Sequence, residues 1–375
     1  MRWRLLLALG FLGFSLAACG GGGAAHTPPS TAASTPPSPA RERSAGSSAA
    51  DAAHAFLATY ANPDGRVVRI DQGGDTVSEG QAYGMLLAAA VGDRTRFQEI
   101  WGWTKSHLER PDGLFAFHWQ DGRVVDTQPA ADADLDVARA LLVGACRFSD
   151  PGLRTQAIRV GRAILAHEVA RAGSLQVLLA GPWANHADNL VFNPSYADPT
   201  TLHALAQMTG NAQFSAVAAG ARTLVNQLTR PLPPDWAIVN TKTGQATPVS
   251  SASSTAGPGV FSFDAPRTLV RFAEGSASGD ASAVARAWPV FSATPPADII
   301  TEHQLSGPPV GSDKNPVTLA GVAGAAKAAG DRSAVSGLLN QAHTLNAQHP
   351  TYYGSAWVAL GRILLTTNLL QPCRS

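Results

Sequence analysis

The sequence has few charged residues and no cluster of charges of one sign. Asp, Glu, Lys and Arg make up 15% of the 375 residues, and the formal net charge is +1. Nucleic-acid binding depends on a stripe or patch of Lys and Arg, so we expect no nucleic-acid partner. The metal-ligand spacings CxxC and HExxH are also absent, so the sequence gives no support for a zinc site.

Long apolar runs are scarce as well, and the run at the N-terminus is too short for a transmembrane helix. Leu5 to Leu16 follows two arginines, which is typical of a secretory signal. The run ends in Leu-Ala-Ala-Cys19-Gly, which resembles the lipobox of bacterial lipoproteins. We predict that residues 1–19 are a signal peptide, that Cys19 is lipidated and that the exported protein is anchored to the bacterial cell envelope. The alternative is an ordinary secretory signal that is cut near Ala18.

Residues 20–50 contain mainly Gly, Pro, Ser, Thr and Ala. Such a segment cannot bury enough apolar area to fold, so we predict a disordered linker between the anchor and a folded domain over residues 51–371. The sequence has only three cysteines. If Cys19 carries lipid, Cys146 and Cys373 remain, and the sequence leaves open whether they form a disulfide.

From Asp51 onward, apolar residues recur at the three- and four-residue spacing of helices, and long loops separate pairs of such segments. Ser78 and Asp93 stand where helix N-caps are expected. We expect about a dozen helices, near residues 51–62, 78–91, 93–108, 132–145, 152–170, 198–209, 211–229, 265–275, 281–291, 315–329, 331–346 and 353–369. Two short apolar runs in the loops, Gln176 to Ala180 and Trp236 to Asn240, are candidate strands. Loops of this length in a compact domain usually carry function.

Three segments place carboxylates at helix starts or in loops, and each has a structural explanation of its own. Glu79 suits the first turn of a helix, Asp132 suits an N-cap, Asp136 could be solvated, and Asp264 could pair with Arg267 three residues later. Together they suit glycoside hydrolysis, which needs one carboxylic acid to protonate the leaving oxygen and a second carboxylate on the opposite side of the sugar.

Eight tryptophans offer flat faces on which sugar rings can stack. Trp101 lies on the apolar stripe of an expected helix, so core packing explains it better than sugar binding. Trp119 and Trp183 lie in loop segments, and we predict that both contact substrate.

Five segments of the sequence resemble the signatures of glycoside hydrolase family 8, and they occur in the family's order. The resemblance covers nearly all of residues 55–370. It implies an (α/α)6 barrel, an inverting mechanism and no metal or organic cofactor. The matching segments are Ser78–Met85, Ala131–Ala138, Asn193–Tyr196, Phe263–Arg267 and Tyr352–Tyr353.

The resemblance also implies roles for individual residues. Glu79 corresponds to the general acid, Asp264 to the general base, and Asp132 to the carboxylate that binds and helps to distort the sugar at the cleavage point. The other predicted substrate-binding residues are Tyr83, Trp119, Asp134, Trp183, Tyr196, Phe263, Arg267 and Tyr353. We therefore predict a monomeric, endo-acting hydrolase of β-1,4-glucan. A chitosanase, a xylanase, or a weakened lipoprotein that only binds exopolysaccharide are the alternatives.

Four positions depart from the family pattern. Ala131 replaces a Ser or Thr, Phe263 replaces a Tyr, Pro266 is unusual at a helix start, and Gly354 replaces a common Asp. The Phe263 change removes a hydroxyl near the attacking water, which leaves the rate and the substrate open.

Glu79 can act as a general acid only if its pKa is raised. A helix N-terminus favours the anionic form of Glu79, whereas a general acid must be protonated when substrate binds. We therefore expect burial and the charge of Asp132 to raise its pKa, and we expect Arg267 or solvent to keep Asp264 ionised.

Overall fold

The computed structural model describes residues 49–253, 257–275, 277 and 279–372. The predicted signal peptide, Cys19 and most of the predicted linker lie outside the described residues. Helix α1 (Ala49–Tyr60) begins two residues before the predicted domain boundary. Ala49 and Ala50 are good helix formers and belong to this first helix.

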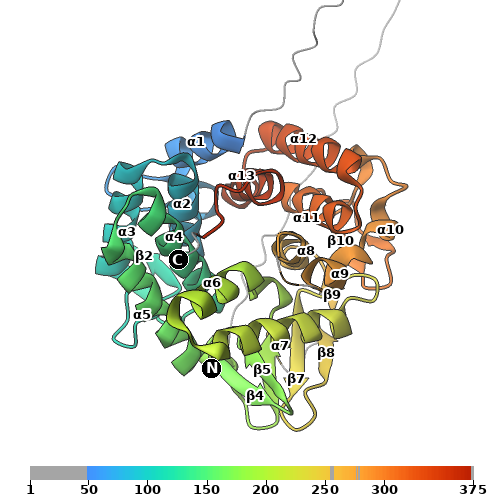
Figure 1. Cartoon of the computed structure of the whole chain (residues 1–375). Helices are drawn as coiled ribbons and strands as arrows, with labels where there is room; N and C mark the ends of the chain where they lie inside the picture. The colour runs from blue at the N-terminus through green and yellow to red at the C-terminus, as the bar shows by residue number, and fades with distance from the viewer. Residues whose placement is uncertain (1–48, 254–256, 276, 278, 373–375) are drawn as a thin grey trace, which may run out of the picture. The chain divides into compact units, whose positions relative to one another are not determined.

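The described helices form an inner and an outer ring (Figure 1). Helices of the inner ring other than α6 are buried on almost every side, whereas those of the outer ring keep an exposed face. The inner ring consists of α2 (Ser78–Val91), α4 (Ala131–Arg147), α6 (Pro199–Thr209), α8 (Ala265–Ala273), α11 (Pro316–Ala328) and α13 (Tyr352–Thr366). The outer ring consists of α1, α3 (Arg94–Leu108), α5 (Pro151–His167), α7 (Ala212–Leu228), the short α9 (Asp280–Ala285) and α10 (Trp288–Phe291), and α12 (Arg332–Gln348). The predicted (α/α)6 barrel is confirmed.

Small residues allow the inner helices to pack closely. In α11, every residue from Pro316 to Ala326 is buried. A Cβ atom at Gly321 would lie 2.5 Å from Cβ of Pro266, and one at Gly324 would lie 2.6 Å from the carbonyl oxygen of Leu269. Both glycines therefore let α11 touch the backbone of α8, which fixes the helix that follows Asp264.

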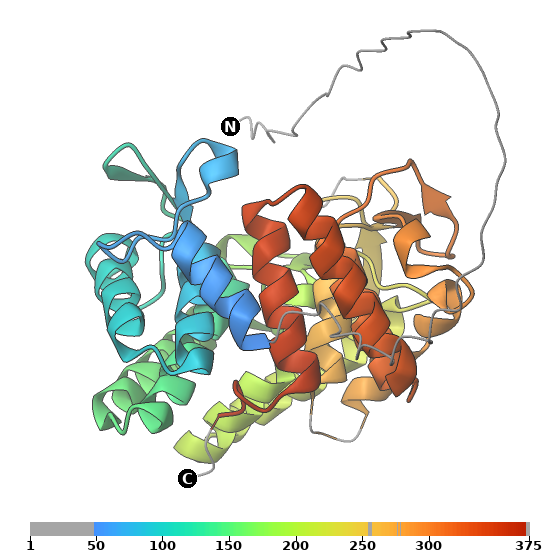
Figure 2. The ribbon, with the colours of Figure 1, turned by 90° about the horizontal axis from the view of Figure 1, so that it is seen from above.

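Short antiparallel strands and 3-10 turns occupy loops that lead from an outer helix to the next inner helix. In Figure 2 the loop with η1 (Ile70–Gln72) and the hairpin β2 (His118–Gln120) to β3 (Arg123–Asp126) project from the same side of the barrel. The remaining strands are β1 (Thr76–Val77), β4 (Val169–Ala172), β5 (Leu175–Leu178), β6 (Asn189–Phe192), β7 (Trp236–Asn240), β8 (Ala246–Val249), β9 (Val260–Phe261), β10 (Glu302–Gln304) and β11 (Pro309–Val310). The 3-10 turns are η1, η2 (Pro182–Ala184), η3 (Pro194–Tyr196) and η4 (Pro296–Asp298). These loops gather where the inner helices begin.

Most predicted helices match, and the differences have local causes. Asp93 caps α3, as predicted, by accepting a hydrogen bond from the N–H of Arg96. Ser78 was predicted as an N-cap, but Val77 holds that position and Ser78 is the buried first residue of α2. The predicted helix 281–291 is broken into α9 and α10, because Pro289 in the first turn of α10 cannot continue a helix from before it. The candidate strands fall on β5 and β7.

Buried ion pairs cross the barrel interior between α4 and α8. Both Nη2 contacts of Arg271 go to the carboxylate of Asp136, at 2.6 and 2.5 Å. One turn further along, Arg139 holds Glu274 with two bonds of 2.6 and 2.8 Å and contacts Asp198 at 3.1 Å. Asp136 is 2% exposed, so the reading of this carboxylate as solvated is wrong.

Two observations bear on the environment of the chain. Cys146, near the end of α4, is disulfide-bonded, and the other two cysteines of the sequence lie outside the described residues. Among the helices of the described residues, none has both the length and the apolar character needed to span a bilayer. The predicted lipid anchor stays a prediction.

Candidate active site

Three inner helices bring carboxylates from distant parts of the sequence to one guanidinium group. Arg267, in the first turn of α8, reaches Glu79 on α2 at 3.4 Å and Asp132 on α4 at 2.8 Å, both through Nη1. Its Nη2 reaches Asp264 at 2.5 Å. Each carboxylate lies at the start of an inner helix, so the barrel geometry itself assembles the cluster.

Glu79 lies in an environment that favours its protonated form. Its side chain is 20% exposed, and the hydroxyl of Tyr352 donates a hydrogen bond to Oε1 at 3.4 Å. Burial raises the pKa of Glu79 to about 7, with Arg267 opposing the rise and the charges of Asp132 and Asp264 adding to it. Burial and the charge of Asp132 both contribute to the rise, as predicted.

Asp264 is held from two sides and remains partly open to water. Its Oδ1 contacts Arg267, and its Oδ2 accepts a hydrogen bond of 3.0 Å from the side-chain amide of Asn193. The amide is itself oriented, because its oxygen accepts bonds from the N–H and the hydroxyl of Ser195. The Asp264 side chain is 25% exposed, so a water molecule can reach it.

Asp132 is the most buried carboxylate of the cluster, at 6% exposure. It accepts one hydrogen bond from Arg267 and one from the N–H of Ala133. Burial raises its pKa, whereas the attraction and the hydrogen bond of Arg267 lower it. Arg267 therefore fixes one oxygen of Asp132 through the same nitrogen that contacts Glu79.

The tyrosines nearest to Arg267 hold the guanidinium. Tyr83 accepts a hydrogen bond of 3.3 Å from Arg267 and one of 3.2 Å from the indole N–H of Trp357. The ring of Tyr196 lies 5.4 Å from the guanidinium carbon, which suits a cation–π contact. Tyr83 is 1% exposed, so its predicted contact with substrate is corrected: it supports Arg267 from inside the barrel.

Asp134 also lies away from the cluster. It is fully buried, and its Oδ1 accepts a hydrogen bond of 3.0 Å from the N–H of Phe115. The fully buried carboxyl of Glu168 is its neighbour, and burial raises the pKa of both groups well above the ordinary range. Asp134 therefore has no side open to a sugar, and its predicted contact with substrate is corrected to a structural role.

A family model for glycosyl hydrolases family 8 matches residues 42–365. The chain belongs to this family.

Similar proteins agree with the assignment to family 8. A probable endoglucanase of Novacetimonas hansenii is 35% identical over 225 residues, which cover 58% of this chain and 64% of that protein. An endoglucanase of Cellulomonas uda is 30% identical over 189 residues, which cover 48% and 53%. The matched part thus spans less than two thirds of either relative. The endo-beta-1,4-glucanase CMCax from Acetobacter xylinum superposes with a TM-score of 0.71 at 28% identity, covering 84% of this chain and 97% of that structure.

The other predicted sugar contacts of this family 8 chain lie in the loops or, for Tyr353, in the first turn of α13. Trp119 on β2 is half-buried and packs edge-on against Trp103, with Arg66 over its ring at 4.9 Å. Trp183 in η2 is half-buried and donates its indole N–H to a backbone carbonyl at 3.1 Å. Phe263 is 48% exposed, and the hydroxyl of Tyr353 donates to its carbonyl oxygen at 2.9 Å. All four keep some exposed surface near the points where the inner helices begin.

Sequence reasoning missed three residues next to the carboxylates. Asn193 and Tyr352 stood inside segments that resemble family 8 signatures, so the signal was present, but only Tyr196 and Tyr353 were given roles. Asp235 gave no signal. It precedes β7 and touches the Asp264 segment only through the fold.

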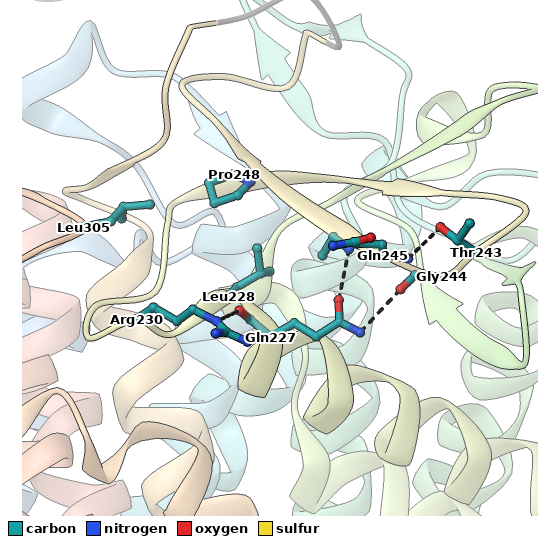
Figure 3. Close-up of a pocket in the computed structure, with 9 residues that line it drawn as sticks. Gln227, Leu228, Arg230, Thr243, Gly244, Gln245, Pro248 and Leu305 are labelled. Carbon is teal, nitrogen blue, oxygen red and sulfur yellow. Dashed lines mark hydrogen bonds between the residues drawn. The ribbon is translucent and has the colours of Figure 1, made fainter.

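A cavity of about 630 Å³ lies apart from this cluster, between the end of α7 and the hairpin of β7 and β8 (Figure 3). Its side chains are held by the hairpin: Gln227 accepts a bond from the N–H of Ala246 and donates to the carbonyl of Gly244. Its lining contains no carboxylate, so it offers no acid–base chemistry. Across the described part of the chain, no group of three or more His, Cys, Asp or Glu residues could hold a metal ion.

Proposed function

We propose that this family 8 protein is an endo-acting, inverting hydrolase of β-1,4-glucan. The observation that carries the proposal is the cluster of Glu79, Asp132 and Asp264 around Arg267, in which the pKa of Glu79 is raised to about 7. The names of the similar endoglucanases, and the Acetobacter xylinum endo-beta-1,4-glucanase among the solved structures, support the choice of substrate.

In the proposed reaction, Glu79 gives its proton to the leaving glycosidic oxygen. Asp264 takes a proton from a water molecule, which attacks the anomeric carbon from the opposite face. The two carboxylates are bonded to different nitrogens of the Arg267 guanidinium, so the group separates them. Inversion calls for carboxyl groups about 6.5–9.5 Å apart, which leaves room for the water.

Asp132 is proposed to bind the sugar at the cleavage point. One of its oxygens is fixed by Arg267, and a carboxylate oxygen can accept more than one hydrogen bond. Its charge also helps to keep the proton on Glu79. The same residue thus serves the substrate and the acid.

The catalytic roles are tested by Glu79→Gln and Asp264→Asn. We expect kcat on carboxymethylcellulose to fall at least about 100-fold in each variant, because each removes a proton-transfer group. The matched control is Glu99→Gln on outer helix α3, which changes the same groups far from the cluster and should keep kcat. Full activity of Glu79→Gln or Asp264→Asn would overturn the corresponding role.

The substrate and the stereochemistry are tested on the wild-type protein. Reducing ends released from carboxymethylcellulose, chitosan and xylan should show β-glucan as the preferred polymer. NMR of the first anomer released should show the α form. Release of the β anomer would reject inversion, and binding of polysaccharide without release of reducing ends would favour a weakened, binding protein.

We also propose that the protein is exported, lipid-anchored through Cys19 and monomeric. The disulfide at Cys146 supports export, because disulfides persist in oxidising compartments. Cys19→Ala should move the protein from the membrane fraction to the soluble fraction and abolish labelling by a radioactive fatty acid. Size-exclusion chromatography with light scattering should give the mass of one chain.

A further inference from the structure

We propose that Asp235 is a positioning residue that caps α8 in place of Asp264, and so leaves the Asp264 carboxylate available to the attacking water. The inference rests on the proposed role of Asp264 as general base. It concerns a residue outside the carboxylate cluster, in the loop before β7.

Asp264 occupies the N-cap position of α8, yet its side chain makes no capping hydrogen bond. An aspartate at this position ordinarily accepts a bond from the N–H of the second or third helical residue. The second residue is Pro266, which has no N–H. The N–H of the third residue, Arg267, is bonded to the carbonyl oxygen of Asp264 at 2.9 Å. Neither Pro266 nor Arg267 therefore offers a free N–H that could bind the Asp264 carboxylate and turn it toward α8.

Asp235 takes over the capping of this helix start. Its Oδ1 accepts hydrogen bonds from the N–H groups of Ser262 at 3.0 Å, Asp264 at 3.2 Å and Ala265 at 2.7 Å. Its Oδ2 accepts the hydroxyl of Ser262. Asp235 is 7% exposed, and its own N–H is bonded to the carbonyl of Val260 at 2.8 Å. One buried side chain thus fixes the backbone on both sides of Asp264.

Because Asp235 caps α8, the Asp264 carboxylate has two hydrogen-bond partners and can accept further hydrogen bonds. Arg267 and Asn193 each occupy one site on its carboxylate, whereas an ionised carboxylate has about four. An N-cap bond would use one of the remaining sites and rotate the side chain toward the helix. The unusual Pro266 therefore has a function here: it removes the N–H that would compete with water.

The test compares Asp235→Ala, Asp235→Asn and Pro266→Ala in kcat and KM on a soluble β-glucan. Asp235→Ala should lower kcat by about 10- to 100-fold with KM within about twofold, since a shift of about 1 Å in a reacting group has effects of that size. Asp235→Asn keeps the Oδ1 acceptor and should retain most of kcat. Pro266→Ala restores the competing N–H and should lower kcat a few-fold.

Two controls separate positioning from plain stability. Asp93→Ala removes an aspartate cap from outer helix α3, so it should lower Tm and leave kcat unchanged. A crystal structure of Pro266→Ala or Asp235→Ala should show the Asp264 carboxylate turned away from Asn193 toward the backbone of α8.

Wild-type kcat in Asp235→Ala would overturn the inference. If Asp235→Ala fails to fold, Pro266→Ala decides: lower kcat at constant KM supports the inference, and wild-type kcat overturns it. An inactive Asp264→Asn together with a fully active Asp235→Ala would reject only the positioning role. Full activity of Asp264→Asn would reject the proposed base itself.

Discussion

Asp132 and Asp136 lie one turn apart on α4, and each faces an arginine of α8, yet the two pairs differ in kind. Arg271 forms two short hydrogen bonds with Asp136 deep in the barrel. Arg267 contacts Asp132, Glu79 and Asp264 at the end of the barrel where the inner helices begin. The same four-residue spacing on both helices therefore produces one structural ion pair and one candidate catalytic cluster.

The ratio of carboxylates to cations explains this difference. Burial raises the pKa of Glu79 to about 7, and the charges of Asp132 and Asp264, which share Arg267 with it, add to the rise. Around Asp136, two arginines, Arg271 and Arg139, contact three carboxylates, Asp136, Asp198 and Glu274, so the charges are closer to balance. Exposure differs as well, because only the cluster around Arg267 has side chains that reach solvent.

The largest expected effect is the loss of the shared cation in Arg267→Met. Three carboxylates would then face one another without compensation, and Asp264 would lose its shortest contact. We expect kcat to fall by about 100- to 1,000-fold, the usual size for a lost electrostatic contact in an active site. Arg159→Met, which breaks an exposed pair with Glu109 on the outer surface, is the control. A loss below tenfold would remove Arg267 from the centre of the proposed mechanism.

Breaking the Asp136–Arg271 pair should lower the stability of the protein and leave its activity nearly unchanged. Asp136→Asn leaves Arg271 buried without its full partner, which typically costs about 3–5 kcal/mol in the free energy of unfolding. Urea unfolding measures that loss, and kcat of the folded enzyme should stay within about threefold of wild type. Replacing both partners, as in Asp136→Leu with Arg271→Met, should recover much of the stability. Loss of kcat without loss of stability would contradict the contrast between the two pairs.

The pH dependence of activity sharpens the comparison further. Glu79 must be protonated to act, and its pKa is raised to about 7, so kcat/KM should fall as pH rises through about 7. The charge of Asp132 raises that pKa, so Asp132→Asn should move the alkaline limb to lower pH in whatever activity remains. Asp136→Asn, one turn away, should leave the limb nearly in place. An unmoved limb in Asp132→Asn would show that the two carboxylates are not coupled.

The barrel and the three proposed catalytic carboxylates could be predicted from the sequence because both depend on local patterns. Helical periodicity gave most helix bounds, and Glu79, Asp132 and Asp264 each stood in a recognisable segment. The faces of α2 and α4 could not be predicted, because these helices are buried on nearly every side and periodicity then marks no direction. That is why Tyr83 and Asp134 were given to the substrate.

Residues that act through long-range contacts escaped for a different reason. Asp235 binds the Asp264 segment across a separation of 29 residues and three intervening strands. Nothing in the local sequence distinguishes it from a loop aspartate before a strand. Pro266 was visible as a departure from the family pattern, but its effect depends on which N–H groups surround Asp264, and only the structure supplies them.

The third carboxylate of the same turn of α4 gives the smallest expected effect. Asp134 has no arginine partner among the described residues and instead neighbours the carboxyl of Glu168, and burial raises the pKa of both well above the ordinary range. A carboxyl with a raised pKa binds more protons in the folded than in the unfolded state. Its contribution to stability is therefore complete below the unfolded value of about 4 and is lost as pH rises toward the folded pKa.

Glu168→Gln should remove this dependence. The amide donates an N–H to Asp134 without needing a proton from solvent, so the free energy of unfolding should fall less between pH 5 and pH 9 than in the wild type. Glu109→Gln on the outer surface should keep the wild-type slope. Equal slopes in Glu168→Gln and wild type would mean that the pair is ionised and balanced in some other way. The number of neighbouring arginines would then no longer explain how Asp132, Asp134 and Asp136 differ.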